Sequence, residues 1–259
     1  MRYFKNIYNG RYILFSLVSR DLKNRYRGTI LGIAWSLVTP LGLVAIIGTV
    51  FSLLWGISMK VFVPYLFSGL IPWLYISACA QGGTTSFISA QGYIKQTQTP
   101  IEIFPIRTAL VEFTNLLFGL GAFFIVYLFI SPENFNYFML MVVPALIIWL
   151  VFGISLATLA ALINTHIRDY APLQGLIIQG FFYVTPIVWK PDILAEKNYG
   201  IIYQLNPIYY MLEIIRRPLL GEMVTDFHVW TIALGITLLL ACASVLFTIR
   251  IGRKITFKL

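Results

Sequence analysis

Long stretches without a charged side chain are the feature that most constrains this chain. Lys, Arg, Asp and Glu are absent from six of them: 28–59, 61–94, 113–132, 134–167, 170–189 and 227–249. Each reaches the roughly 20 residues that an α-helix needs to cross about 30 Å of hydrocarbon. The sequence therefore predicts an all-α polytopic membrane protein with six transmembrane helices, at about 30–56, 63–86, 107–130, 137–163, 171–189 and 228–250.

The composition excludes a water-soluble globular protein. Of the 259 residues, 59% are apolar and 11% are charged, whereas about 25% of a soluble domain is charged. The first apolar stretch begins only after residue 27 and is far longer than the roughly 7–15 apolar residues of a cleaved signal peptide. We therefore expect a retained helix, and treat residues 1–259 as a single transmembrane domain.

The net charge of +9 is explained by membrane orientation. Basic residues cluster before the first predicted span and after the last, and the positive-inside rule places such clusters in the cytoplasm. With six spans and both termini inside, the loops at 95–107 and around Arg168 are also cytoplasmic, so that 14 of the 19 basic residues lie on that side. The charge thus predicts a multi-pass protein in contact with membrane lipid, and no nucleic-acid partner.

Residues 3–27 precede the first span and form a basic, amphipathic segment. At helical spacing, one side is apolar (Leu14, Leu17, Val18, Leu22) and another is polar and mostly basic (Arg20, Lys23, Asn24, Arg27), with Arg25 close by. This pattern predicts an interface helix that lies flat on the cytoplasmic face, with its apolar side in lipid and its basic side toward headgroup phosphates or a partner. Simple anchoring is the open alternative.

Two further segments interrupt the spans. Residues 91–105 are polar and contain Pro100 and Pro105, which predicts a cytoplasmic loop with a short helix. Residues 190–226 are apolar and aromatic but are divided by Pro207 and Pro218, which predicts short re-entrant external helices between spans 5 and 6. Glu112 is the only carboxylate near a membrane interior, and we expect it to be solvated or paired near the end of its span.

The sequence lacks the usual signatures of catalysis. It contains no GxxxxGK[ST] phosphate loop, no HExxH, no CxxC and no DxDxDG calcium loop. Cys79 and Cys242 fall in different predicted spans and are expected to be packing residues. We therefore predict no catalytic, cofactor-binding or metal-binding residues in this chain, and an energy source on another polypeptide.

Aromatic residues make up 16% of the chain and gather near the predicted span ends. Most of them fit the aromatic belts of the two membrane interfaces. Some could instead line a path for a sugar polymer, because aromatic faces contact the CH faces of pyranose rings without holding them too tightly to slide. The candidates for this path and its gate are Trp35, Phe181, Phe182, Tyr183, Tyr209 and Tyr210.

Four segments in order along the chain show a family resemblance: SRDLKNRYRGTILGIAWSLVTPLG (19–42), PYLFSGLIPWLY (64–75), RDYAPLQGLIIQGFFYVTPIVW (168–189) and NPIYYMLEIIRRPLLG (206–221). They resemble the membrane subunits of type-2 ABC exporters, and within that group the Wzm-type branch, which exports O-antigen, related polysaccharides or teichoic acids. The sequence departs from the pattern at Ile94-Lys95-Gln96, where IKK is common, and at Thr185-Pro186, where Ser-Pro is frequent.

The resemblance implies a transport permease of the bacterial cytoplasmic (inner) membrane that is not itself an enzyme. Two copies would form a homodimer and pair with two copies of an ABC nucleotide-binding subunit, which would hold ATP and Mg. It also implies a coupling helix in 91–105, a path between the two subunits lined by spans 1 and 5, and an exit gate in 190–226. The residues expected to couple the chain to the ATPase are Lys95, Gln96, Glu102 and Arg168.

Three functions are therefore weighed. The leading one is ATP-driven export of a lipid-linked, O-antigen-like polysaccharide. The second keeps the fold but exports drugs or lipids. The third is a membrane-embedded glycosyl- or phospho-transferase, for which the only close acid and base pairs are Arg20 with Asp21 and Arg168 with Asp169.

Overall fold

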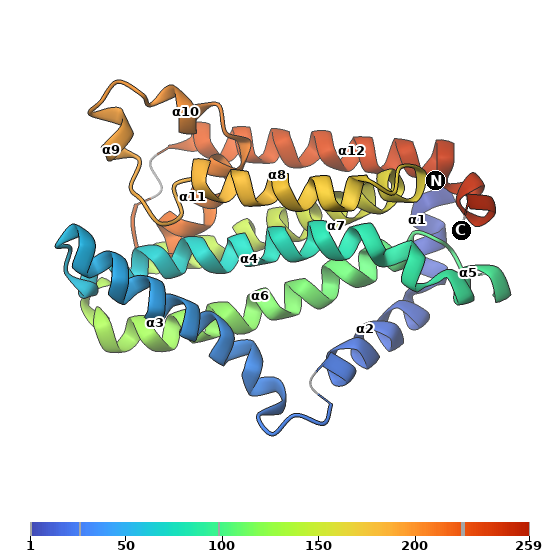
Figure 1. The fold of residues 1–259 in the computed structure, drawn as a ribbon, viewed down its shortest axis with the longest axis horizontal. Coiled ribbons are helices and arrows are strands. Elements are labelled where there is room, and N and C mark those ends of the chain that lie inside the picture. The colour runs from blue at the N-terminus through green and yellow to red at the C-terminus, as the bar shows by residue number, and fades with distance from the viewer. Residues whose placement is uncertain (1, 26, 98, 224–225, 259) are drawn as a thin grey trace.

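The computed structural model describes residues 2–25, 27–97, 99–223 and 226–258, which form a bundle of α-helices (Figure 1). Residues 26, 98 and 224–225 belong to the predicted segments 3–27, 91–105 and 190–226, and they lie outside the described residues. The described ranges contain no β-strand. The prediction of an all-α fold is therefore confirmed.

Among the described residues, five helices are long and apolar enough to cross a membrane: Trp35–Trp55, Met59–Gln96, Ile103–Ile130, Tyr137–His166 and Phe227–Gly252. They comprise α3 (Trp35–Trp55), α4 (Met59–Ser89) with α5 (Gln91–Gln96), α6 (Ile103–Ile130), α7 (Val142–His166) with the 3-10 turn Tyr137–Met141 before it, and α12 (Phe227–Lys258). The polytopic character of the chain is thus confirmed.

The count of six spans is not confirmed, because the expected fifth span is short. It forms α8 (Tyr170–Val184), whose 15 residues extend about 22 Å at 1.5 Å per residue. Thr185 has extended backbone angles (φ −86°, ψ 135°), as expected for a residue that precedes a proline, here Pro186. The proline thus ends the helix inside the charge-free stretch.

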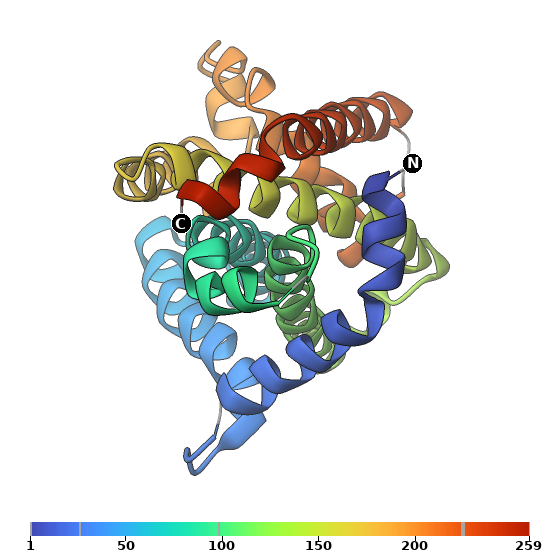
Figure 2. The ribbon, with the colours of Figure 1, turned by 90° about the vertical axis from the view of Figure 1, so that its right-hand side faces the viewer.

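The central helix of the bundle is α4, with α3, α6, α7 and α8 around it (Figure 2). In its most apolar stretch 72% of the residues are buried, against 22% in α3 and in α12. The helix runs without interruption through Pro64 and Pro72. The outer helices α3 and α12 therefore leave long apolar faces for lipid or another subunit.

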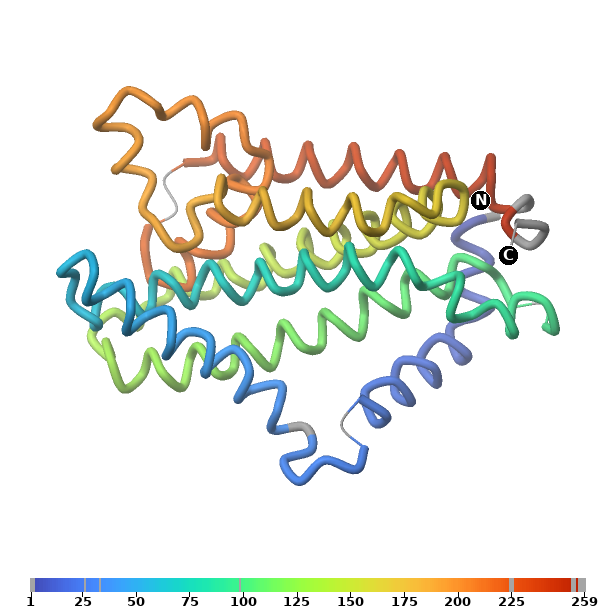
Figure 3. Tube along the Cα trace, in the orientation of Figure 1, coloured from blue at the N-terminus to red at the C-terminus, as the bar shows by residue number. Residues whose placement is uncertain are grey.

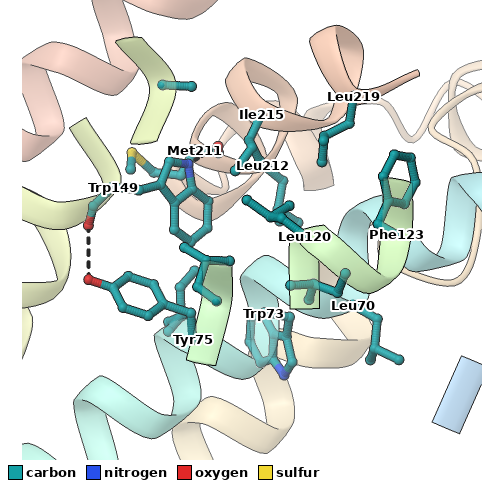
Figure 4. Packing of buried hydrophobic residues seen from close by; sticks show 14 of the residues in the cluster. Leu70, Trp73, Tyr75, Leu120, Phe123, Trp149, Met211, Leu212, Ile215 and Leu219 are labelled. Carbon is teal, nitrogen blue, oxygen red and sulfur yellow. Dashed lines mark hydrogen bonds between the residues drawn. The ribbon is translucent and has the colours of Figure 1, made fainter. Parts of the chain in front are cut away.

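The core joins α4 and α7 to α11 (Pro207–Leu219). The fully buried Trp149 of α7 donates its Nε1 hydrogen to the Met211 carbonyl at 3.1 Å, and Tyr75 of α4 donates its hydroxyl hydrogen to the Trp149 carbonyl at 3.2 Å (Figure 4). Leu212, Ile215 and Leu219 of α11 point into the same cluster (Figure 4). This helix is consequently part of the core and not a surface loop.

The N-terminal segment forms two helices, α1 (Arg2–Asn9) and α2 (Arg11–Arg25). They meet at Gly10, where a Cβ atom would lie 2.1 Å from Ile103 Cδ1 at the start of α6. Leu14 and Leu17, from the predicted apolar side, are each 5% exposed and pack in a cluster with residues of α4, α5 and α6. The expectation that this side lies in lipid is therefore wrong, because the start of α6 offers it an apolar surface.

The two ends of the bundle differ. One end, here called the α5 end, holds α1, α5, the turn between α7 and α8, and the last turns of α12; the opposite end, the α9 end, holds α9 (Asp192–Ala195) and α10 (Ile201–Gln204) (Figure 1). Between the ends, the last turns of α2 and the first turns of α3 project outward from the bundle toward each other (Figure 3). The α5 end and the α9 end therefore form two separate candidate sites.

Candidate functional site

Two ion pairs hold α2 against α6. The Asp21 carboxylate pairs with the Arg107 guanidinium, and Arg25 donates from Nη1 to Glu112 Oε2 at 3.2 Å. Asn115 also donates to Glu112, at 2.9 Å. Glu112 is thus paired, although it lies about two and a half turns into α6 and not at its end. The interface helix is held to the bundle by charge as well as by apolar packing.

Reversing the charge of Asp21 is expected to loosen α2. Asp21→Arg would place two guanidinium groups side by side, so that amide hydrogen exchange over residues 11–25 should become roughly five- to tenfold faster. Adding Arg107→Asp restores an ion pair of opposite polarity and should return the exchange close to its original rate. If the double variant exchanges as fast as Asp21→Arg alone, this pair does not hold the helix.

The expected coupling segment is connected to the interface helix. Lys95 and Gln96 are exposed on α5, while Ile94 beside them is buried. Arg20 of α2 donates from Nη1 to the Tyr93 hydroxyl at 2.7 Å, a hydrogen bond that raises the pKa of Arg20. A displacement of α5 would therefore be transmitted to α2.

Glu102 lies apart from the exposed coupling candidates. Glu102 is 9% exposed, and its Oε1 accepts a hydrogen bond from Asn6 Nδ2 of α1 at 3.0 Å. Burial raises the pKa of Tyr3, also in α1, to about 12, and the charge of Glu102 adds to this rise. The position of Glu102 favours a role in seating α1 over direct contact with a partner.

Arg168 lies exposed in the turn between α7 and α8, at the same end as α5 (Figure 1). Asn164 fixes this turn: its Nδ2 donates to the Thr84 carbonyl at 2.8 Å, and its Oδ1 accepts from the Ala171 amide at 3.2 Å. The structure thus presents Lys95, Gln96 and Arg168 at one end of the bundle.

The aromatic path candidates do not share one surface. Phe181 and Tyr183 are exposed near the end of α8, whereas Phe182 packs on Trp73 with ring centroids 5.6 Å apart. Trp35 lies at the start of α3 and lines a cavity of about 260 Å³ beside Arg25. Five of the six candidates lie in α8 and α11, and only Trp35 lies in α3.

Tyr209 and Tyr210 belong to an aromatic cluster at the α9 end. The Tyr209 ring lies 5.0 Å from Tyr203 and 5.2 Å from Tyr210, centroid to centroid. Tyr210 donates its hydroxyl hydrogen to the Gln204 carbonyl at 2.8 Å, which connects α10 to α11. Burial raises the pKa of Tyr209 to about 12, so its hydroxyl is neutral at physiological pH.

A group of charges in and just after α11, with the buried pair Glu213 and Arg216 at its centre, has no counterpart among the predicted sites. We call it the α11 charge cluster, and it consists of Glu213, Arg216, Arg217 and Asp226. Glu213 is 7% exposed and Arg216 is 2% exposed. Arg216 Nη1 lies 3.2 Å from Glu213 Oε1, Arg217 Nε lies 2.9 Å from Glu213 Oε2, and Arg217 Nη1 lies 2.6 Å from Asp226 Oδ2.

Tyr65 connects this cluster to α4 and to the segment that follows α8. Its hydroxyl accepts from Arg216 Nη1 at 3.1 Å and lies 2.9 Å from the Trp189 carbonyl, and Arg216 Cζ lies 4.3 Å from the centre of the ring. At Gly69, one turn further along α4, a Cβ atom would lie 2.2 Å from Arg216 Nη2. Glu213 precedes the two arginines by three and four residues, a spacing that places side chains next to each other on a helix. This spacing was the signal in the sequence from which the ion pairs could have been predicted.

Of the two acid and base pairs considered for a transferase, Arg20 and Asp21 each bind another residue, and Arg168 and Asp169 are both exposed. Arg20 bonds to Tyr93 and Asp21 pairs with Arg107, so the two side chains face different partners. Within the described ranges, no group of three or more His, Cys, Asp or Glu side chains is placed to hold a metal ion. The geometry therefore gives the transferase hypothesis no support.

Comparisons with known proteins agree with this arrangement. The sequence profile of the family described as ABC-2 type transporter matches residues 12–220, from α2 to the end of α11. An O-antigen export system permease protein RfbA of Klebsiella pneumoniae is 28% identical over 201 residues, which is 77% of each chain. An O-antigen export system permease protein RfbA of Myxococcus xanthus is 24% identical over 217 residues, 82% of each chain.

Proposed function

Because the chain belongs to the ABC-2 type transporter family, as the membrane subunit of a type-2 ABC exporter, we propose that it forms the channel through which a lipid-linked, O-antigen-like polysaccharide crosses the cytoplasmic membrane. The names of its relatives, both O-antigen export permeases, support this substrate class. ATP and Mg would bind to the separate nucleotide-binding subunit, and this chain would need no cofactor. Both termini would be cytoplasmic.

The observation that supports the transport mechanism most strongly is the position of α5. This short helix exposes Lys95 and Gln96 and follows directly on α4, the most buried of the membrane-length helices. Arg20 connects it to α2 as well. A nucleotide-binding subunit that pushes on α5 would thus act on the centre of the bundle and on the interface helix together.

The channel would lie between two copies of this chain, lined by α3 and α8. Both helices leave large apolar side chains exposed, among them Val38, Ile46, Leu53, Leu173, Leu176 and Phe181. A second copy would cover part of these faces, since exposed apolar faces in a membrane bundle can be covered by lipid or by protein. The short helices at the α9 end would gate the exit.

Removing the exposed side chains of α5 is expected to uncouple the two subunits. Lys95→Ala with Gln96→Ala should reduce transport-linked ATP hydrolysis by roughly three- to tenfold, because exposed polar contacts in an interface are worth about 1 kcal/mol each. The hydrolysis rate of the purified complex measures this, and Lys197→Ala, an exposed lysine at the other end, is the matched control. An unchanged rate of ATP hydrolysis would contradict a contact at Lys95 and Gln96, and would leave Arg168 as the proposed contact with the nucleotide-binding subunit.

The substrate class is tested by what stimulates the complex. The chain and its nucleotide-binding partner in lipid nanodiscs should hydrolyse ATP faster when lipid-linked glycan is added and should respond little to small amphiphiles. The opposite response would contradict polysaccharide export and would favour the second hypothesis, export of drugs or lipids by a protein of the same family.

A further inference from the structure

Two adjoining cavities at the α9 end suggest a further binding site, and this inference rests on the proposed function. We propose that together they form a groove that binds several sugar units of the exported chain as it leaves the bundle. The first cavity has a volume of about 310 Å³ and lies against α11; the second has a volume of about 320 Å³ and lies between the first turns of α4 and the end of α6. Tyr65, Lys190, Leu220 and Glu222 line both.

The shared lining makes the two cavities one elongated site. Each has the size of a small-ligand pocket, which begins at about 300 Å³. Tyr209 of α11 lines only the first, and Lys60 and Glu133 line only the second. A site of this form suits a chain of repeated units better than one compact molecule.

The charges along the groove are balanced. Its lining contains four basic and four acidic side chains: Lys60, Lys190, Arg216 and Arg217, with Glu133, Asp192, Glu213 and Glu222. A site for a phosphate or another strong anion would show an excess of basic groups, whereas here each sign is matched. Hydroxyl groups both donate and accept hydrogen bonds, so a neutral, hydroxyl-rich ligand can use both kinds of partner.

The first cavity also offers tyrosine rings. Tyr203 and Tyr209 both line it, are partly exposed, and lie edge to face with centroids 5.0 Å apart. Aromatic side chains combine an apolar face with, in tyrosine, a polar tip, which suits the CH face and the hydroxyl edge of a pyranose. The Tyr65 ring has a different role, because the Arg216 guanidinium already lies 4.3 Å from its centre.

The floor of the groove is fixed before any ligand binds. Arg216 is 2% exposed and is bonded to both Tyr65 and Glu213. Tyr127 donates its hydroxyl hydrogen to the Leu220 carbonyl at 2.9 Å, which holds the end of α11 against α6. A preformed floor lowers the entropy that a flexible sugar chain must lose on binding.

Saturation-transfer difference NMR tests this assignment on the full chain with its nucleotide-binding partner in nanodiscs. The probe is a water-soluble oligosaccharide released by mild acid from the surface glycan of the strain that expresses the chain. We expect transfer to the sugar CH protons, reduced at least threefold in Tyr209→Ala and in Glu222→Gln. Tyr199→Ala, an exposed tyrosine of the same segment that lines neither cavity, should leave it unchanged.

Two results would overturn the assignment: equal transfer in the original chain and both groove variants, or displacement of the oligosaccharide by an excess of inorganic phosphate, which would show an anion site. Glu222→Gln keeps the test valid if Tyr209→Ala fails to fold, because Glu222 is exposed and its replacement is nearly isosteric. Normal export by the chain together with unchanged transfer in both variants would reject the groove while leaving the proposed function intact.

Discussion

Replacing Glu213 by leucine is expected to destabilise the protein by about 3–5 kcal/mol, the usual cost of leaving one partner of a buried ion pair without its counterion. Glu213 is the carboxylate that pairs with Arg216, whose side chain is almost fully inaccessible. Arg217 keeps its second partner, Asp226, so the cost arises mainly at Arg216. Unfolding of the purified chain by heat or by denaturant in detergent measures the loss.

A second substitution separates this account from a general intolerance of α11. Adding Arg216→Met to Glu213→Leu removes the unpaired charge and replaces the buried pair by apolar side chains, which is commonly neutral or stabilising. Most of the lost stability should return. Glu196→Leu, at an exposed position of the same segment, is the matched control and should change stability by less than about 0.5 kcal/mol. A double variant as unstable as Glu213→Leu would contradict the account.

Replacing Gly83 by alanine is expected to force α4 and α7 apart. A Cβ atom there would lie 2.7 Å from Ala157 Cα and 2.7 Å from the Ala157 carbonyl oxygen, both backbone atoms that no rotamer change can move. Overpacking of this kind costs about 1–3 kcal/mol, despite the roughly 1 kcal/mol that alanine gains over glycine in a helix. Small residues commonly allow such close approach between membrane helices.

Gly121→Ala is the matched control for this prediction. Gly121 lies within α6, and a Cβ atom there would have no neighbour within 4 Å. The substitution should leave the melting temperature in detergent unchanged or raise it, while Gly83→Ala lowers it. Equal effects of the two substitutions would mean that the contact between α4 and α7 does not depend on Gly83.

The distribution of charge was sufficient to predict the helical bundle. Membrane-length helices appear in five of the six charge-free stretches. The stretch at 170–189 shows the limit of the rule, because hydropathy does not register the backbone restriction that Pro186 places on Thr185. Helix ends inside an apolar stretch depend on such local geometry.

The environment of individual side chains was harder to predict. The apolar side of α2 was expected in lipid, but a helical wheel cannot distinguish lipid from an apolar protein surface, and Leu14 and Leu17 pack on the bundle. Arg216 lies in the segment 190–226, which was predicted to be external, and its burial was not predicted. This burial depends on Tyr65 and Gly69, about 150 residues earlier in the chain, and no local pattern connects positions so far apart.

The measurement that tests the central claim most directly is the location of lipid-linked glycan in a strain that lacks this chain. If the chain is the export channel, undecaprenyl-linked glycan should accumulate on the cytoplasmic side, the cell surface should lose the polysaccharide, and expression of the intact chain should restore it. Normal surface polysaccharide in the deletion strain would contradict the account.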